Sequence, residues 1–255
     1  MCFRLNTEIL LNDFKTIGLY ELRAVSLRDR IETKYIIPIV DLQTFLNSIS
    51  KSHSVLNINN EFLHNYQTFY YDTVDSKMYL DHHNKKANRY KIRIRHYHES
   101  NLFFLEIKNK SNKGRTLKKR MPINSISIKN NPEAFEFIKK NSPFILDKLS
   151  PVLGNSFRRI TLVDNKLTER LTIDINLNVW EIGNEINKKS FKKFAIIELK
   201  RDANSIADTH LKLRDFRIKP IGFSKYAISS SILFSDKLKA NNFKKKYRIV
   251  NKLEQ

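Results

Sequence analysis

Basic side chains recur at alternate positions in residues 90–110. Alternate side chains of an extended chain share a face, so Lys91, Arg93 and Arg95 lie together while apolar side chains occupy the other face. A polar Glu-Ser-Asn turn then reverses the chain, and the return strand adds Lys108 to the charged face. Like charges on neighbouring strands repel, which favours an anionic ligand between them. The alternative is an antiparallel sheet whose polar face is solvated and needs no ligand.

The same alternation of basic with apolar or aromatic residues recurs along the chain. The basic positions are Lys34, Arg93, Arg95, Lys108, Lys118, Arg120, Arg159, Arg170 and Lys200. If the strands close into a barrel, these cations converge on an axial cavity and their apolar neighbours turn outward beneath helices. Such a cavity needs phosphates or fixed carboxylates to offset its charge. Carboxylates that offset part of it, and that suit Mg²⁺ or Mn²⁺ as oxygen ligands, are Glu32, Glu106, Asp174 and Glu198.

The composition agrees with a polyanion as ligand. The chain has 255 residues, with 47 Lys and Arg against 26 Asp and Glu, and a formal charge of +21. Nucleic acid, anionic lipid and polyphosphate are all attracted by such a charge. Only five glycines are present, and neither a P-loop nor a dinucleotide-binding glycine motif occurs, so side chains must hold any phosphate.

The same sequence sets expectations for domain organisation and location. With 41% hydrophobic residues we expect one domain over 1–255, with a core at about 29–235, a helical segment at 1–28 and a basic segment at 236–255. No apolar run approaches the ~18 residues of a spanning helix, and no signal peptide is recognisable, so we expect a cytoplasmic protein. The single cysteine, Cys2, excludes an internal disulfide.

The periodicity predicts about eight main strands interrupted by helices. Helical patterns occur around 9–25, 132–149 and 205–216, a short helix follows Asp41 as its cap, and another begins after Ser224. Residues 78–80 are predicted as a short strand. We interpret the adjacent His82 and His83 as non-ligands, because neighbouring strand residues point to opposite faces. The expected fold is α+β, an eight-stranded antiparallel β-barrel with helices packed outside.

Seven short motifs in this order resemble the vacuolar transporter chaperone (VTC) domain. They are Arg-Ile-Glu-Thr-Lys-Tyr at 30–35, Arg-Ile-Arg at 93–95, Glu-Ile-Lys at 106–108, Phe-Arg-Arg at 157–159, Arg-Leu-Thr-Ile-Asp at 170–174, Ile-Glu-Leu-Lys at 197–200 and Phe-Ser-Lys-Tyr at 223–226. This family belongs to the triphosphate tunnel metalloenzymes, so the resemblance implies an eight-stranded antiparallel tunnel. It also implies a polyphosphate polymerase that transfers the terminal phosphoryl group of ATP to inorganic polyphosphate, with Mn²⁺ favoured over Mg²⁺.

The resemblance implies roles for individual residues. Catalytic contacts to triphosphate and product are expected from Lys34, Arg93, Arg95, Lys108, Arg159, Lys200 and Lys225. Further substrate-binding residues are expected to be Lys91, Lys118, Arg120, Phe157, Arg170 and Ser224, and Glu198 with Glu32 is expected to hold the metal. Phosphoryl transfer needs positioning and charge neutralisation more than a covalent nucleophile, which agrees with this set.

Two departures and two alternatives bear on this interpretation. Arg30 stands where related tunnel hydrolases have the first glutamate of a Glu-x-Glu-x-Lys strand, which disfavours a two-metal hydrolase. Larger eukaryotic members carry an inositol-phosphate-sensing module and membrane helices that this sequence lacks, so a separate membrane partner is expected. The alternatives are a metal-dependent hydrolase of triphosphates or nucleoside triphosphates, and a non-catalytic polyanion-binding protein. Nucleic acid is not the expected partner, because no RNA-recognition, helix-turn-helix or zinc-finger signature occurs.

Overall fold

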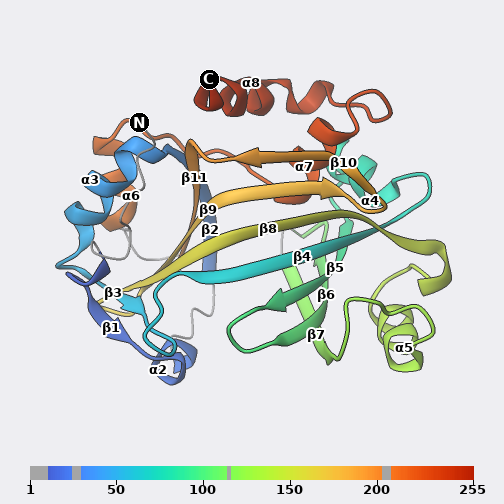
Figure 1. Cartoon of the computed structure of the whole chain (residues 1–255), viewed down its shortest axis with the longest axis horizontal. Helices are drawn as coiled ribbons and strands as arrows, with labels where there is room; N and C mark the ends of the chain where they lie inside the picture. Colours follow the sequence, from blue (N-terminus) through green and yellow to red (C-terminus); the bar gives the residue numbers. More distant parts are fainter. Residues whose placement is uncertain (1–10, 25–29, 114–115, 203–207) are drawn as a thin grey trace.

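A curved antiparallel sheet forms the centre of the molecule (Figure 1). The computed structural model describes residues 11–24, 30–113, 116–202 and 208–255. Eight strands follow one another across the sheet, and every pair along this path is antiparallel. In spatial order they are β2 (Arg30–Pro38), β11 (Phe194–Asp202), β9 (Glu169–Glu181), β8 (Leu149–Asp164), β4 (His64–Thr73), β5 (Arg89–Tyr97), β6 (Leu102–Lys110) and β7 (Thr116–Ile123).

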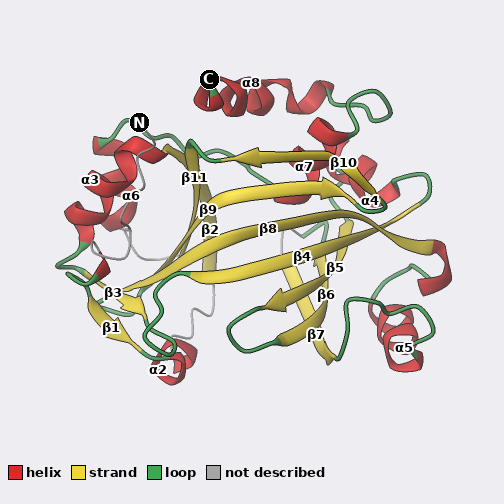
Figure 2. Ribbon diagram, viewed as in Figure 1, coloured by secondary structure: helices red, strands yellow, loops and turns green. Residues whose placement is uncertain are grey.

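Three short strands and seven helices complete the described part of the chain. The short strands are β1 (Lys15–Ile17), β3 (His53–Leu56) and β10 (Asn184–Phe191). The helices are α2 (Leu19–Ala24), α3 (Ile39–Ile49), α4 (Lys77–His83), α5 (Pro132–Asn141), α6 (Asp208–Asp215), α7 (Lys225–Leu233) and α8 (Lys244–Glu254). Figure 2 shows α3 and α6 together at one end of the sheet and α5 beside β7. None of the helices described is long and apolar enough to cross a membrane.

The predicted barrel is wrong in one respect, because hydrogen bonds do not close the sheet within the described residues. On this path β2 pairs with β11 only and β7 pairs with β6 only. The segment before α7 approaches β2, and the backbone N–H of Ile221 donates to the carbonyl oxygen of Lys34 at 2.7 Å. The sheet nevertheless curls far enough for Lys108 on β6 to reach Glu32 on β2, with 3.6 Å between Nζ and Oε2. We call the inner side of this curl the concave face.

The convex face is apolar and covered by helices, as the alternation of residues predicts. On β11, Ile197 and Leu199 are buried and belong to one core cluster with Phe45 and Leu46 of α3. A second cluster, centred on β4 to β6, packs beneath α5. Both clusters leave the charged side chains of the same strands on the opposite face.

Part of the concave face is also apolar, which the expectation of helices packed only outside did not foresee. Ile36 lies two residues after Lys34 and Ile196 two residues before Glu198, on the same strand faces, yet both are buried in a third core cluster. That cluster includes residues of α7 and α8, such as Tyr226. These two helices therefore cover one end of the concave face, next to its charged part.

Several local predictions are corrected by tertiary contacts. Residues 78–80 lie in α4 instead of a strand, so His82 and His83 end a helix. Helix α3 begins at Ile39 after Pro38, and Asp41 lies in its first turn instead of capping it. The segment predicted as helical at 9–25 contains β1 and α2 where it is described, and the helix predicted over 132–149 ends at Asn141. Residues 1–10, 25–29 and 205–207 of the predicted helical segments lie outside the described residues. Ser224 caps α7 as predicted, since its side chain accepts from the Ala227 N–H.

Asp72, at the end of β4, fastens two helices to the sheet. Its fully buried carboxylate accepts from the backbone N–H groups of Met78 at 2.9 Å and Tyr79 at 3.0 Å, which holds the first turn of α4. It also accepts from the hydroxyl of Tyr226 on α7. Tyr226 follows Lys225 in the chain, so Asp72 helps to fix the position of that lysine.

Replacing Asp72 with alanine should destabilise the protein. The substitution leaves two backbone N–H groups and one hydroxyl buried without a partner, and each such group costs about 1–3 kcal/mol. We expect the free energy of unfolding in urea to fall by at least about 2 kcal/mol. The control is Asp75→Ala on the exposed turn nearby, which should change little. Equal stability of the two variants would contradict the role given to Asp72.

Candidate functional site

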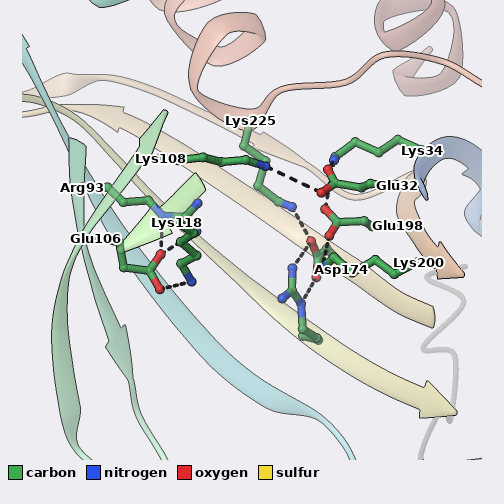
Figure 3. A network of polar contacts seen from close by, with 11 residues as sticks. Glu32, Lys34, Arg93, Glu106, Lys108, Lys118, Asp174, Glu198, Lys200 and Lys225 are labelled. Atoms are coloured by element: carbon green, nitrogen blue, oxygen red, sulfur yellow. Dashed lines mark hydrogen bonds and ion pairs between the residues drawn. The ribbon is translucent and has the colours of Figure 1, made fainter. Parts of the chain in front are cut away.

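Basic side chains from seven strands and one helix converge on the concave face. Register and alternation place all eleven predicted basic residues there: Lys34, Lys91, Arg93, Arg95, Lys108, Lys118, Arg120, Arg159, Arg170 and Lys200 from the strands, and Lys225 from α7. Four carboxylates lie among them: Glu32, Glu106, Asp174 and Glu198. In Figure 3, Arg93, Glu106 and Lys118 lie on one side of the view. Glu32, Lys34, Asp174, Glu198 and Lys200 lie on the other side, and Lys108 lies between the two sides and pairs with Glu32.

Glu106 is the centre of the first group. Its carboxylate is only 1% exposed and accepts from Nε of Arg93 at 2.8 Å, while Nη2 of Arg93 lies 2.6 Å away. Lys118 forms an ion pair with the other oxygen. Burial raises the pKa of Glu106, but Arg93, Arg95 and Lys118 outweigh burial and hold it well below its usual range. Glu106 therefore stays ionised and fixes two cations at the surface of the sheet.

Asp174 is the centre of the second group. Arg159 donates to it in bidentate fashion, with Nε at 2.5 Å and Nη2 at 2.8 Å from the two oxygens. Lys225 of α7 also pairs with Asp174, so this carboxylate joins the sheet to the helix. Although burial raises the pKa of Asp174, Arg159 and Lys225 lower it to about 2. Removing one partner of a buried ion pair of this kind strongly destabilises a protein, because the other charge is left buried and unpaired.

Glu198 and Glu32 form the third group around Lys34. The Nζ of Lys34 lies 3.0 Å from Glu198 and also pairs with Glu32, while Lys200 pairs with the other oxygen of Glu198. Burial lowers the pKa of Lys34 to about 8, despite Glu198. The pKa of Lys118, in the first group, is lowered to about 8 in the same way. Both lysines therefore lose their charge around pH 8, well below the usual range for lysine.

Aromatic rings support the cations at one end of the concave face. Tyr66 stacks on Phe157 with 5.4 Å between ring centroids, and the Arg159 guanidinium lies 4.9 Å from the Tyr66 ring. The guanidinium of Arg95, a residue that is 8% exposed, lies 5.6 Å from the centroid of the same Tyr66 ring. Lys225 lies 4.4 Å from the Phe157 ring. These contacts help to position three cations, two of which, Arg159 and Lys225, are also paired with Asp174.

Most of the predicted site residues lie in one charged network, and the others lie around it. Lys34, Arg93, Lys108, Lys118, Lys200, Lys225, Glu32 and Glu198 lie in the network of Figure 3, with Arg159 bound to Asp174. Arg170 lies opposite Lys200 on the neighbouring strand, and Lys91 donates to Ser224 Oγ at 2.8 Å. Arg120 is exposed and lies over the ring of Phe104 at 4.8 Å. Phe157, predicted to bind substrate, is buried beneath Arg159 and Lys225.

Four residues of the site carried weak signals in the sequence. Glu106 and Asp174 were expected to offset charge and to suit Mg²⁺ or Mn²⁺ as oxygen ligands, and in the structure each also positions two basic side chains. Tyr66 belongs to an aromatic strand and shares the face of Thr68 and Tyr70, which alternation alone would indicate. Asp72 gives no sequence signal, because its partners lie 6, 7 and 154 residues away.

The carboxylates near Lys34 are chemically suited to a divalent cation that is shared with a phosphate ligand. Within the described residues, no group of three or more His, Cys, Asp or Glu side chains is placed to hold a metal. Glu32 and Glu198 lie together, since both contact the Lys34 ammonium. Mg²⁺ is commonly held by one or two carboxylates together with substrate phosphates and water, so two carboxylates are sufficient protein ligands.

Comparisons with known proteins identify a family and several distant structures. No curated protein matches the chain significantly. A Bacillus halodurans structure, a candidate adenylate cyclase, has TM-score 0.49 and 13% identity, covering 85% of this chain and 97% of that one. A Vibrio parahaemolyticus counterpart has TM-score 0.47 and 13% identity, covering 80% and 99%. A Hippeastrum candidate adenylyl cyclase with dominant triphosphatase activity has TM-score 0.47 and 16% identity, covering 82% and 97%.

Because these TM-scores are below 0.5, the likeness assigns no activity to this chain. The family comparison is more extensive. The model of the VTC domain matches residues 29–234, a range that contains β2 to α7 and therefore every charged residue described above. The resemblance seen in the sequence motifs is confirmed, and the chain belongs to the VTC domain family.

Proposed function

We propose that the protein is a metal-dependent polyphosphate polymerase that transfers the terminal phosphoryl group of ATP to a growing inorganic polyphosphate chain. The observation that carries this proposal is the charge of the concave face, where eleven basic side chains surround four carboxylates. Such an excess of positive charge is costly unless an anion of high charge density lies among the cations. A triphosphate and a phosphate chain are anions of this kind, and membership of the VTC domain family supports the choice.

The proposed reaction needs no covalent intermediate on the protein. A terminal oxygen of the polyphosphate chain attacks the γ-phosphorus of ATP, a new P–O–P bond forms, the bond to the β-phosphate breaks, and ADP leaves. Negative charge shifts to the ADP oxygens during transfer. Guanidinium groups such as Arg93 and Arg159, fixed beforehand by Glu106 and Asp174, are positioned to stabilise that charge without rearranging.

Glu198 and Glu32 are the residues that would hold Mn²⁺ or Mg²⁺. When bound, the ion would neutralise phosphate charge beside Lys34 and Lys200. In the protein alone, Lys34 contacts both carboxylates and offsets their charge.

The ionisation of the carboxylates favours a phosphate acceptor over water. Hydrolysis requires a base to take a proton from water, and the pKa values of Glu106, Asp174 and Glu198 are all lowered by basic neighbours that outweigh burial. Carboxylates of this kind are weak bases. A terminal phosphate is already anionic and needs no base. Hydrolysis of triphosphates and simple polyanion binding remain the competing functions, and the membrane partner expected from the resemblance stays a prediction.

Incubation of the protein with ATP and Mn²⁺ or Mg²⁺ should yield polymer. We expect polyphosphate to appear on gels together with stoichiometric ADP and little free phosphate. Arg159→Met should lower polymer formation about 10²–10³-fold, the usual cost of removing one prearranged donor to a developing charge. The matched control is Arg158→Met, since Arg158 lies on the convex face of the same strand and should not be needed. Free phosphate without polymer would indicate a hydrolase. If neither polymer nor free phosphate appears, the non-catalytic polyanion-binding function is favoured.

Affinity for tripolyphosphate should fall as pH rises through about 8. The pKa values of Lys34 and Lys118 are lowered to about 8 by burial, so both are charged below that pH and lose their charge above it. A bound anion favours the charged forms, and binding near pH 8 should therefore take up protons. Calorimetry in two buffers of different ionisation enthalpy measures this uptake. The double variant Lys34→Arg and Lys118→Arg, whose guanidinium groups stay charged, should show a weaker pH dependence. Equal pH dependence in both proteins would contradict the assignment.

A further inference from the structure

Two pairs of like charges extend the basic surface beyond Glu106. On the concave faces of β5 and β6, Lys91 lies directly opposite Lys108, and Arg89 lies directly opposite Lys110. We call these four residues the basic ladder. Like charges opposite one another on neighbouring strands are destabilising, and two consecutive pairs of them are unusual in a sheet. The next pair, Arg93 opposite Glu106, is an ordinary ion pair.

Most of the basic ladder lacks an acidic partner. Lys108 reaches Glu32 across the curl of the sheet. Among the described residues, no ion pair to a carboxylate is formed by Arg89, Lys91 or Lys110. Lys91 donates to the Ser224 hydroxyl at 2.8 Å, and Arg89 donates to the carbonyl oxygen of Lys86 at 2.6 Å. These neutral acceptors hold the side chains without offsetting their charge.

The two ends of the β5–β6 pair differ in the residues that face one another. Towards the other end of the pair, Arg95 lies opposite Phe104 and Tyr97 lies opposite Leu102, so no cation faces another cation there. Pairs of cations that face one another are therefore confined to the end of β5 and β6 that contains Arg89 and Lys110. From Arg93 to Arg89 the strand advances about 13 Å, at about 3.3 Å for each of four residues.

Helices α7 and α8 add positive charge beside the basic ladder. Ser224 caps α7 and binds Lys91, which places the positive end of the α7 dipole next to the ladder. The ammonium of Lys246 on α8 lies 3.5 Å from the position that a Cβ would take at Gly222, two residues before Ser224. The same positive charge acts on His82 at the end of α4. Its pKa is lowered to about 2, mainly by burial and further by Lys91, Arg89, Lys246 and Lys110.

We propose that the basic ladder, with Lys246, binds the part of a phosphate chain that extends past the triphosphate site. The chain then leaves the concave face between the β5–β6 pair and the start of α7. This inference rests on the proposed function and specifies the direction in which the polymer runs. The apolar cluster of α7 and α8 covers the neighbouring strands at this end, so the ladder is the polar route beside it.

The test compares a short and a long phosphate chain as ligands. Calorimetric titrations with tripolyphosphate and with long linear polyphosphate are made on the wild type and on the double variant Arg89→Gln and Lys110→Gln. We expect the variant to bind the long chain at least ~10-fold more weakly, a loss of about 1.4 kcal/mol, while tripolyphosphate affinity stays within about twofold. The dependence of long-chain affinity on salt should also become shallower by about one to two contacts, as for other linear polyanions.

A matched control removes the same charges elsewhere. Arg214→Gln with Lys212→Gln alters two exposed residues of α6, beside α3 and distant from β5 in Figure 1, and should leave both affinities unchanged. Retained tripolyphosphate binding shows that the ladder variant is folded. An equal loss of affinity for both ligands, or no loss for either, would overturn the role proposed for the basic ladder while the proposed function stands. Failure of the wild type to bind either ligand would overturn the proposed function itself.

Discussion

Repulsion among cations on one concave surface is the constraint that governs this structure. Eleven basic side chains and four carboxylates share that surface, and the carboxylates are each held by two cations. The cost is visible in the lysines, because burial and neighbouring cations lower the pKa of Lys91, Lys200 and Lys225 as well as that of Lys34. A ligand that binds only the folded protein and supplies negative charge would relieve this repulsion and stabilise the fold.

The interactions that form the site are also those that hold the sheet in its curved shape. Hydrogen bonds do not join the two edge strands of the eight-strand path, β2 and β7, in the described chain, but the Lys108–Glu32 contact links β2 to β6, the neighbour of β7. Helix α7 is attached through Asp174 to Lys225 and through Asp72 to Tyr226. The charged and apolar parts of the concave face thus meet at α7, which both closes the core and supplies a cation to the site.

Alternation within single strands was readable from the sequence, whereas pairing between distant strands was not. Arg93 and Arg95 face inward because their neighbours Ile92 and Ile94 require burial. The Arg159–Asp174 pair depends on the register of β8 with β9, which a β-bulge shifts near Ser156. The region of α4 was misassigned because the acceptors for its first turn come from the side chain of Asp72, which precedes the helix at the end of β4 and follows no helix-capping spacing. Family membership was readable because its motifs are short local segments, six of them within single strands and one at the start of α7.

The charge of the concave face implies that phosphate groups lie against it. A crystal structure of the protein with tripolyphosphate and Mn²⁺ tests this most directly. The account predicts phosphate density between the Arg93–Lys118 group and the Lys34–Lys200–Lys225 group, with the ion beside Glu198 or Glu32. Phosphate bound only to lysines of the outer surface, with the ion pairs of the concave face intact and no density between them, would contradict it.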